Sequence, residues 1–363
     1  EEAREAYAKS LILEPDAPEV QSNLVMCFSY DPSVDGEALL GAHKGWAARH
    51  ERPAASAPDR PRDPDRVLRI GYVSPDLWTH SVAYFIEPVL EHYDRNAFHV
   101  TCYADVDSPD ETTARLRDHA DRWHDTAALS DDALYDLIRA DGIDILFDLA
   151  GHTSNNRLPV FGRRAAPVQI TWIGYPATTG LAGMDYRITD DWADPRGETD
   201  RFHSEALLRL PQGFLCYAPP RNVALPETGR NGRPLTFGSF NNLAKVTDAV
   251  IALWSRVLNE VPEARMLIKS RQLADDGVRT RILGVFAEHG ISEERLDLRA
   301  RVASRDGHLS LYGEVDVALD TFPYNGTTTT CEALWMGVPV VTLAGDLHAG
   351  RVGASLLHQC ALD

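Results

Sequence analysis

Short β-rich runs alternate with amphipathic segments from Val67 to the end of the chain, and this alternation restricts the fold more than any other feature of the sequence. Strands separated by helical segments are typical of βαβ units, in which each helix returns the chain to the same parallel sheet. The first series predicts helices at 81–92, 110–118 and 130–140, and strands at 67–73, 99–105, 143–151, 168–175 and 185–190. This part of the chain is therefore predicted to form an α/β domain.

A second α/β series follows a stretch rich in Pro and Gly at 218–233, which we interpret as a connector between two domains. The series predicts helices at 246–260, 275–289 and 328–337, and strands at 235–240, 265–270, 296–302, 315–322 and 338–345. A chain of 363 residues has the length of two domains. Two Rossmann-like domains that face a cleft, spanning 67–217 and 234–363, are the simplest architecture, and ligands would bind at the carboxyl ends of the strands.

The first 50 residues are helical by pattern and are separated from the α/β region by a Pro-rich linker at 51–66. Ala3, Tyr7 and Ser10, with Pro15 closing the helix, match the second helix of a tetratricopeptide repeat. The sequence begins without Met and stops at "HQCALD", so we expect it to be a piece of a longer protein that is truncated at its C-terminal end.

The net charge of the chain argues against a nucleic-acid or membrane partner. With 36 Lys and Arg against 54 Asp and Glu, it is −18, whereas both partners require clustered positive charge. The sequence has no run of 18 apolar residues. The five cysteines are far apart and lack metal-binding spacing, which predicts reduced thiols in a cytoplasmic protein.

A run of four threonines, Thr327 to Thr330, lies between a predicted strand and a predicted helix, directly after Asn325 and Gly326. The first backbone amides of a helix have no partners and attract phosphate. Ordinary capping is the alternative, but it needs one hydroxyl and contributes about 1 kcal/mol. We therefore predict a phosphate site here. Glu332 is a candidate to bind a ribose diol, or else only a favourable first-turn acid.

Two further candidate residues follow strands. Lys245 comes after the first strand of the second series, where an ammonium group could neutralise a diphosphate, although a lysine there is often only solvated surface. His80 follows the first strand of the first series, where it could act as a base or as a hydrogen-bonding group, or simply be a polar helix end.

Several motifs of other enzyme classes are missing. The sequence contains no GxGxxG after a strand, no GxxxxGK[ST], no GxSxG and no HExxH. The acidic triplets at 63–65 and 105–107 are interpreted as solvated charge rather than as a metal site. Phosphate would then be neutralised by lysine and helix amides without a metal.

Four long segments together resemble the protein O-glycosyltransferases of the O-GlcNAc transferase and SPINDLY family. They are "LRIGYVSPDLWTHSVAYFIE", the segment from "APVQITWIGYPATTGL" to "GMDYRITD", "LTFGSFNNLAKVT" and "LDTFPYNGTTTTCEALWMGVPVVTLAG". The resemblance covers residues 20–363. It implies tetratricopeptide repeats ahead of a two-Rossmann (GT-B) catalytic unit, inverting chemistry on Ser and Thr hydroxyls, and neither metal nor cofactor.

The resemblance also implies roles for single residues. His80 matches the family's active-site histidine, and Lys245 matches the lysine on the donor diphosphate. The other positions matched to the nucleotide sugar are Asn242 near the diphosphate, His308 beside the base, Thr328 and Thr329 on the β-phosphate, Glu332 on the ribose, and Ile173 and Gly174 near the sugar.

Two departures make the chain more similar to the SPINDLY branch. Thr327 and Glu332 stand where O-GlcNAc transferases proper have His and Asp. The donor is therefore left open between UDP-GlcNAc and GDP-fucose, with Ser- or Thr-containing proteins, recruited by the repeats, as acceptors. A non-catalytic scaffold with a retained transferase fold, and a transferase for a small molecule or lipid, are the alternative functions.

Overall fold

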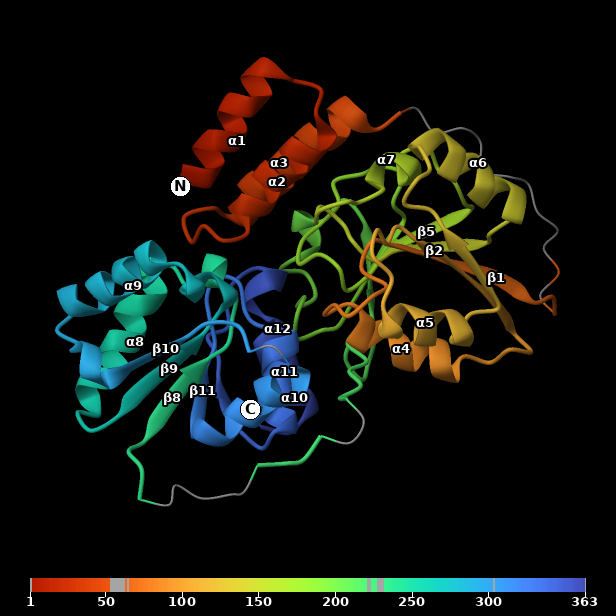
Figure 1. Ribbon diagram of the computed structural model, residues 1–363. Helices are drawn as coiled ribbons and strands as arrows, with labels where there is room; N and C mark the ends of the chain where they lie inside the picture. The colour runs from red at the N-terminus through yellow and green to blue at the C-terminus, as the bar shows by residue number, and fades with distance from the viewer. Residues whose placement is uncertain are drawn as a thin grey trace. The chain divides into compact units, whose positions relative to one another are not determined.

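The computed structural model describes residues 2–52, 63, 65–220, 223–226, 232–302 and 304–362. The chain divides into two compact units, Glu1–Ala218 and Pro219–Asp363, which are described separately (Figure 1). Much of the expected linker at 51–66 and part of the expected connector at 218–233 lie outside the described residues.

The first unit contains a parallel sheet of seven strands in the order β3-β2-β1-β4-β5-β6-β7. The strands are β1 (Leu68–Ser74), β2 (Phe98–Ala104), β3 (Arg122–Asp125), β4 (Ile145–Asp148), β5 (Val168–Thr171), β6 (Tyr186–Thr189) and β7 (Ala206–Arg209). Ser74 pairs with Ala104, so β1 and β2 end side by side. Because all neighbours are parallel, the loops after the strands gather at one edge.

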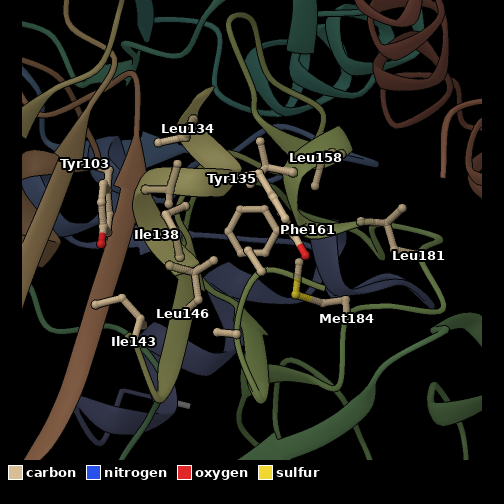
Figure 2. Packing of buried hydrophobic residues seen from close by; sticks show 14 of the residues in the cluster. Tyr103, Leu134, Tyr135, Ile138, Ile143, Leu146, Leu158, Phe161, Leu181 and Met184 are labelled. Carbon is tan, nitrogen blue, oxygen red and sulfur yellow. The ribbon is translucent and has the colours of Figure 1, made fainter. Parts of the chain in front are cut away.

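The helices that connect these strands are α4 (Ala83–His92), α5 (Glu111–His119), α6 (Asp131–Asp141) and α7 (Leu158–Phe161). Asp110 and Ser130 cap α5 and α6, each accepting a hydrogen bond from a backbone amide of the first turn. The apolar faces of α6 and α7 pack on the sheet, where Phe161, Ile138 and Leu146 lie together (Figure 2).

Three helices precede the first strand: α1 (Glu2–Leu13), α2 (Pro18–Phe28) and α3 (Gly36–His50). Trp46 of α3 is completely buried and belongs to the same hydrophobic cluster as Leu158 and Phe161 of the sheet domain. This helical region is therefore continuous with the α/β core in one compact unit.

The second unit has a parallel five-stranded sheet in the order β10-β9-β8-β11-β12. Its strands are β8 (Thr236–Ser239), β9 (Arg265–Lys269), β10 (Leu296–Arg299), β11 (Val317–Leu319) and β12 (Val340–Val341). Its helices are α8 (Asp248–Glu260), α9 (Asp276–Glu288), α10 (Arg305–Ser310), α11 (Thr328–Trp335) and α12 (Val352–Gln359). Two parallel α/β sheets in one chain confirm the predicted fold class.

The structure corrects one interpretation made from the sequence. Asp105, taken there as solvated charge, is only 5% exposed because it follows directly on β2 and turns back into the unit. Asp107, two residues further on, is exposed as expected. Within the described ranges, no helix is long and apolar enough to cross a membrane.

Candidate functional site

Lys245 ends a short 3₁₀ turn (Leu243–Lys245) that follows β8. Its Nζ donates a hydrogen bond to the Asn325 carbonyl oxygen at 2.7 Å and lies 3.7 Å from the centre of the Tyr324 ring. Burial lowers the pKa of Lys245 to about 8, and the nearby carboxylate of Asp320 limits this fall. The structure thus places a poorly hydrated ammonium group directly before the threonine run.

The helix α11 begins at Thr328, with Thr327 at its N-cap position. Its first hydrogen bond runs from the Cys331 amide to the Thr327 carbonyl at 3.1 Å, so the preceding amides have no acceptor within the helix. The Thr327 side chain makes no capping hydrogen bond. Ordinary capping by the first threonine, the alternative considered from the sequence, is therefore not what the structure shows.

The later threonines fix the shape of the turn. The Thr329 hydroxyl donates to Asn241 Oδ1, and the Thr330 hydroxyl donates to the Gly326 carbonyl, each at 3.0 Å. A Cβ at Gly326 would lie 2.2 Å from the Thr329 hydroxyl oxygen, so only glycine fits. The Gly326 amide donates to the buried Asp320 carboxylate at 2.7 Å, which holds the turn onto the end of β11.

Glu332 and His308 are in direct contact. His308 Nε2 lies 2.9 Å from Glu332 Oε2, and Lys269 Nζ lies 2.7 Å from His308 Nδ1. Because an ammonium group only donates, Nδ1 accepts and the ring proton sits on Nε2, where it is donated to Glu332. Burial lowers the pKa of Lys269, and Glu332 opposes this effect. Glu332, only 4% exposed, is thus already engaged by a protein partner on one oxygen.

The two asparagines after β8 have different surroundings. Asn242 is exposed, and its Oδ1 accepts hydrogen bonds from the Ala244 amide at 3.1 Å and Gln272 Nε2 at 2.7 Å. Asn241 is buried against Thr329. Asn241 and Lys269 were not predicted from the sequence. The signal available for Asn241 was its place beside Asn242 at a strand end.

The first unit holds His80 in the loop after β1. His80 Nδ1 lies 3.4 Å from Asp76 Oδ1, and the ring stacks on Trp78 with centroids 5.9 Å apart. Burial raises the pKa of Asp76, while His80 opposes this effect. Asp76, four positions before the histidine, is a third residue at a candidate position, after Asn241 and Lys269, that was not predicted from the sequence.

Ile173 and Gly174 form a tight turn after β5 in the same unit. The Gly174 amide donates to the Trp172 carbonyl at 2.7 Å, and Ile173 between them has φ of 54°. A β-branched residue rarely adopts this left-handed region. A Cβ on Gly174 would lie 1.9 Å from the Leu149 carbonyl oxygen, so the backbone after β5 touches the backbone after β4.

We expect Gly174→Ala to lower the free energy of unfolding by about 1–3 kcal/mol or more, because the methyl group must displace the Leu149 backbone. Gly41→Ala is the control, since a Cβ there meets nothing within 4 Å and should stabilise α3 by about 0.5–1 kcal/mol. Urea unfolding of both variants measures the difference. Equal midpoints would show that the close approach does not exist.

Residues 47–218 and 223–362 match the sequence pattern of glycosyl transferase family 41. The chain belongs to glycosyl transferase family 41. The match covers both α/β units and includes every site residue described above.

Several curated relatives are similar along nearly the whole chain. A probable UDP-N-acetylglucosamine–peptide N-acetylglucosaminyltransferase SPINDLY of Oryza sativa subsp. japonica is 43% identical over 99% of the chain. The Arabidopsis thaliana protein of the same name is 42% identical over 96% of it. The chain spans only 39% of the length of each of these relatives.

The fold is also similar to that of a solved structure. A mutant O-GlcNAc transferase of Thermobaculum terrenum is 40% identical with a TM-score of 0.93. The similarity covers 99% of this chain and 69% of that one. The expected resemblance to the O-GlcNAc transferase and SPINDLY family is confirmed.

Proposed function

We propose that this chain carries the catalytic units of an inverting protein O-glycosyltransferase. The enzyme would transfer one sugar from a nucleotide diphosphate sugar to Ser or Thr hydroxyls of proteins. In this proposal residues 234–363 form the donor-binding lobe, residues 67–217 form the acceptor lobe, and the helical region at 1–50 is the end of a repeat array that recruits peptide. The relatives named as peptide N-acetylglucosaminyltransferases support the proposal.

The observation that carries the proposal is the 2.7 Å hydrogen bond between Lys245 Nζ and the Asn325 carbonyl. It brings a partly desolvated cation to a position two residues ahead of the N-cap of α11, where free amides point out of the helix. A diphosphate bound there would meet a positive charge and several N–H donors at once. A ligand with concentrated negative charge would be stabilised both by the Lys245 charge and by the amide donors of α11.

The proposed chemistry follows from this arrangement. The oxygen of the acceptor hydroxyl bonds to the anomeric carbon while the bond from that carbon to the diphosphate breaks, with inversion. The nucleoside diphosphate leaves with an additional negative charge, which Lys245 and the α11 amides stabilise. The hydroxyl proton passes to His80 or to a phosphate oxygen of the leaving group. We assign no metal or cofactor to this reaction.

Donor and acceptor are tested together by offering UDP-GlcNAc and GDP-fucose in parallel to acceptor proteins and analysing the products by mass spectrometry. We expect one of the two donors to add a single sugar mass to Ser or Thr. Transfer of neither sugar, together with no calorimetric binding of UDP or GDP, would reject the proposal in favour of a non-catalytic scaffold. Transfer to a small molecule or lipid alone would reject the protein acceptor.

A further inference from the structure

A cavity of about 360 Å³ lies in the first unit, and none of the residues that line it is among those assigned to the donor. Its walls come from the start of α2 and from the loops that follow β2, β3 and β4. The residues that line it are Pro18, Glu19, Asp105, Asp107, Ala127, Leu129, Asp131, Asn155, Asn156, Arg157 and Pro159. Its volume is at the lower end of the range for small-ligand sites.

One polar atom in the wall is buried without a partner. Asp105 Oδ1 accepts from the Thr126 hydroxyl at 2.7 Å and from Arg157 Nη2 at 3.0 Å. Asp105 Oδ2 has no hydrogen-bond partner in the part of the chain that the structure describes. Buried carboxylate oxygens are rarely left unpaired because desolvation without a donor is costly. The wall therefore lacks a hydrogen-bond donor at this atom.

The charge of the cavity restricts the sign of a ligand. Four acidic residues line it, Glu19, Asp105, Asp107 and Asp131, against the single cation Arg157. The guanidinium of Arg157 is already paired with Asp105 and, at 2.8 Å, with Asp131. An anion would meet excess negative charge, whereas a cation with N–H donors would supply what Asp105 Oδ2 lacks.

A metal ion does not fit these side chains. Among the described residues, no group of three or more His, Cys, Asp or Glu side chains is arranged to hold one. An organic cation, with several N–H groups that spread over a wider site, matches the separated carboxylates better.

The cavity and the candidate acceptor loop lie at the same edge of the first sheet. Asp105 follows β2, and its amide donates to the carbonyl of Ser74, the last residue of β1, at 2.9 Å. The loop after Ser74 carries His80, and the Thr79 amide in that loop donates to Asp110 Oδ2 at 2.9 Å. Asp105 in the cavity wall is thus hydrogen-bonded to the strand end from which the His80 loop begins, in the lobe that we propose for the acceptor.

We propose that this cavity binds the guanidinium or ammonium group of an Arg or Lys residue in the acceptor polypeptide. This proposal rests on the proposed function, because it assumes a polypeptide acceptor. It makes a basic residue near the modified Ser or Thr a determinant of acceptor choice. Glu19 and Asp107, which are exposed in the cavity wall, attract the cation, and Asp105 receives its hydrogen bond.

The test measures binding by fluorescence anisotropy, without donor sugar. Labelled peptides with a central Ser carry one Arg at each flanking position in turn, and matched peptides carry citrulline, which has nearly the same shape without the charge. For at least one position we expect the Arg peptide to bind about tenfold more tightly, because charge-assisted hydrogen bonds are the stronger ones. The ratio should fall to near one in the Glu19→Gln/Asp107→Asn variant.

The control variant is Glu293→Gln/Glu294→Gln, which removes two exposed acids from the second unit and so changes the net charge equally. It should keep the preference for Arg. Equal binding of Arg and citrulline peptides to the unaltered chain would overturn the inference. Saturable binding of spermidine without any peptide preference would overturn the assignment to a polypeptide.

The test distinguishes failure of the cation site from failure of the proposed transferase function. If no sugar is transferred but the Arg preference and its loss in the variant are observed, the cation site stands and the transferase proposal fails. If sugar is transferred to Arg and citrulline peptides with equal KM, the cation site fails and the transferase proposal stands.

Discussion

We expect replacement of Lys245 with alanine to lower the turnover number of the proposed sugar transfer by at least about 100-fold, the usual cost of removing one preorganised group from a developing negative charge. The Lys245 ammonium donates a hydrogen bond to the Asn325 carbonyl, directly ahead of the N-terminus of α11. In the proposed reaction its loss would leave the departing diphosphate without this positive charge. Steady-state rates with the preferred donor measure the effect.

A pH profile separates this role from a structural one. Because the pKa of Lys245 is lowered to about 8, its charge is present below that pH and is lost above it. The ratio kcat/KM of the unaltered chain should therefore decline as pH rises through about 8, and this decline should be missing in Lys245→Ala. Lys44→Ala, an exposed lysine of α3, is the matched control. Unaltered rates in Lys245→Ala would reject the assignment.

Acidification below about pH 6.5 should destabilise the first unit steeply, because two of its histidines are buried in the neutral form. Burial lowers the pKa of His43 to about 4. It lowers that of His152 to about 3, with help from the adjacent His43. His43 Nδ1 donates to the Leu39 carbonyl while Nε2 accepts from the Tyr175 hydroxyl at 2.8 Å. A second ring proton would break the bond from Tyr175 and leave a buried charge.

His152 is also buried in the neutral form, so its protonation destabilises the folded chain as well. Its Nε2 donates to the Thr179 carbonyl at 2.8 Å, and its Nδ1 accepts from Ser22 at 3.1 Å. Between pH 6.5 and 4 these histidines bind protons in the unfolded chain but not in the folded chain. The free energy of unfolding therefore has its full value above pH 6.5 and decreases as the pH falls. Each histidine contributes a slope of about 1.4 kcal/mol per pH unit.

Urea unfolding at a series of pH values measures this slope. His152→Asn should remove about half of the slope from these two residues, because only one of them then remains to titrate. His289→Asn, at an exposed position in the second unit, should leave the slope unchanged. If the free energy of unfolding has the same pH slope in the unaltered chain and in both variants, His43 and His152 are not buried in the neutral form.

The two strands of the first sheet that sequence patterns did not predict are β3 and β7, its two edges. Each has four residues and none of them is buried, so neither carries the apolar run that marks the central strands. Helix starts were predicted within two residues at α5 and α6, which Asp110 and Ser130 cap, and also at α11, which has no capping side chain. The short helix α10 was not predicted although Ser304 caps it. A pattern along the chain reports burial, and an edge strand has little of it.

For the candidate site, the sequence predicted which residues follow strands but not which of them touch. The pairing of Glu332 with His308 joins positions 24 residues apart, and that of Lys245 with Asn325 joins positions 80 apart. Such contacts depend on the strand order, with β8 beside β11, which no local pattern encodes. Asp105 was misjudged because a residue at the end of a strand can turn inward as readily as outward.

The burial of Trp46 within the α/β core has a mechanical consequence. Helix α3 cannot tilt against the sheet domain without opening that core, and Ser22 of α2 is bonded to His152 in the loop after β4. A repeat array attached ahead of α1 would therefore transmit its movements to this loop through α2 and α3. Bending of such an array by a bound protein would displace the backbone at the contact between Gly174 and Leu149.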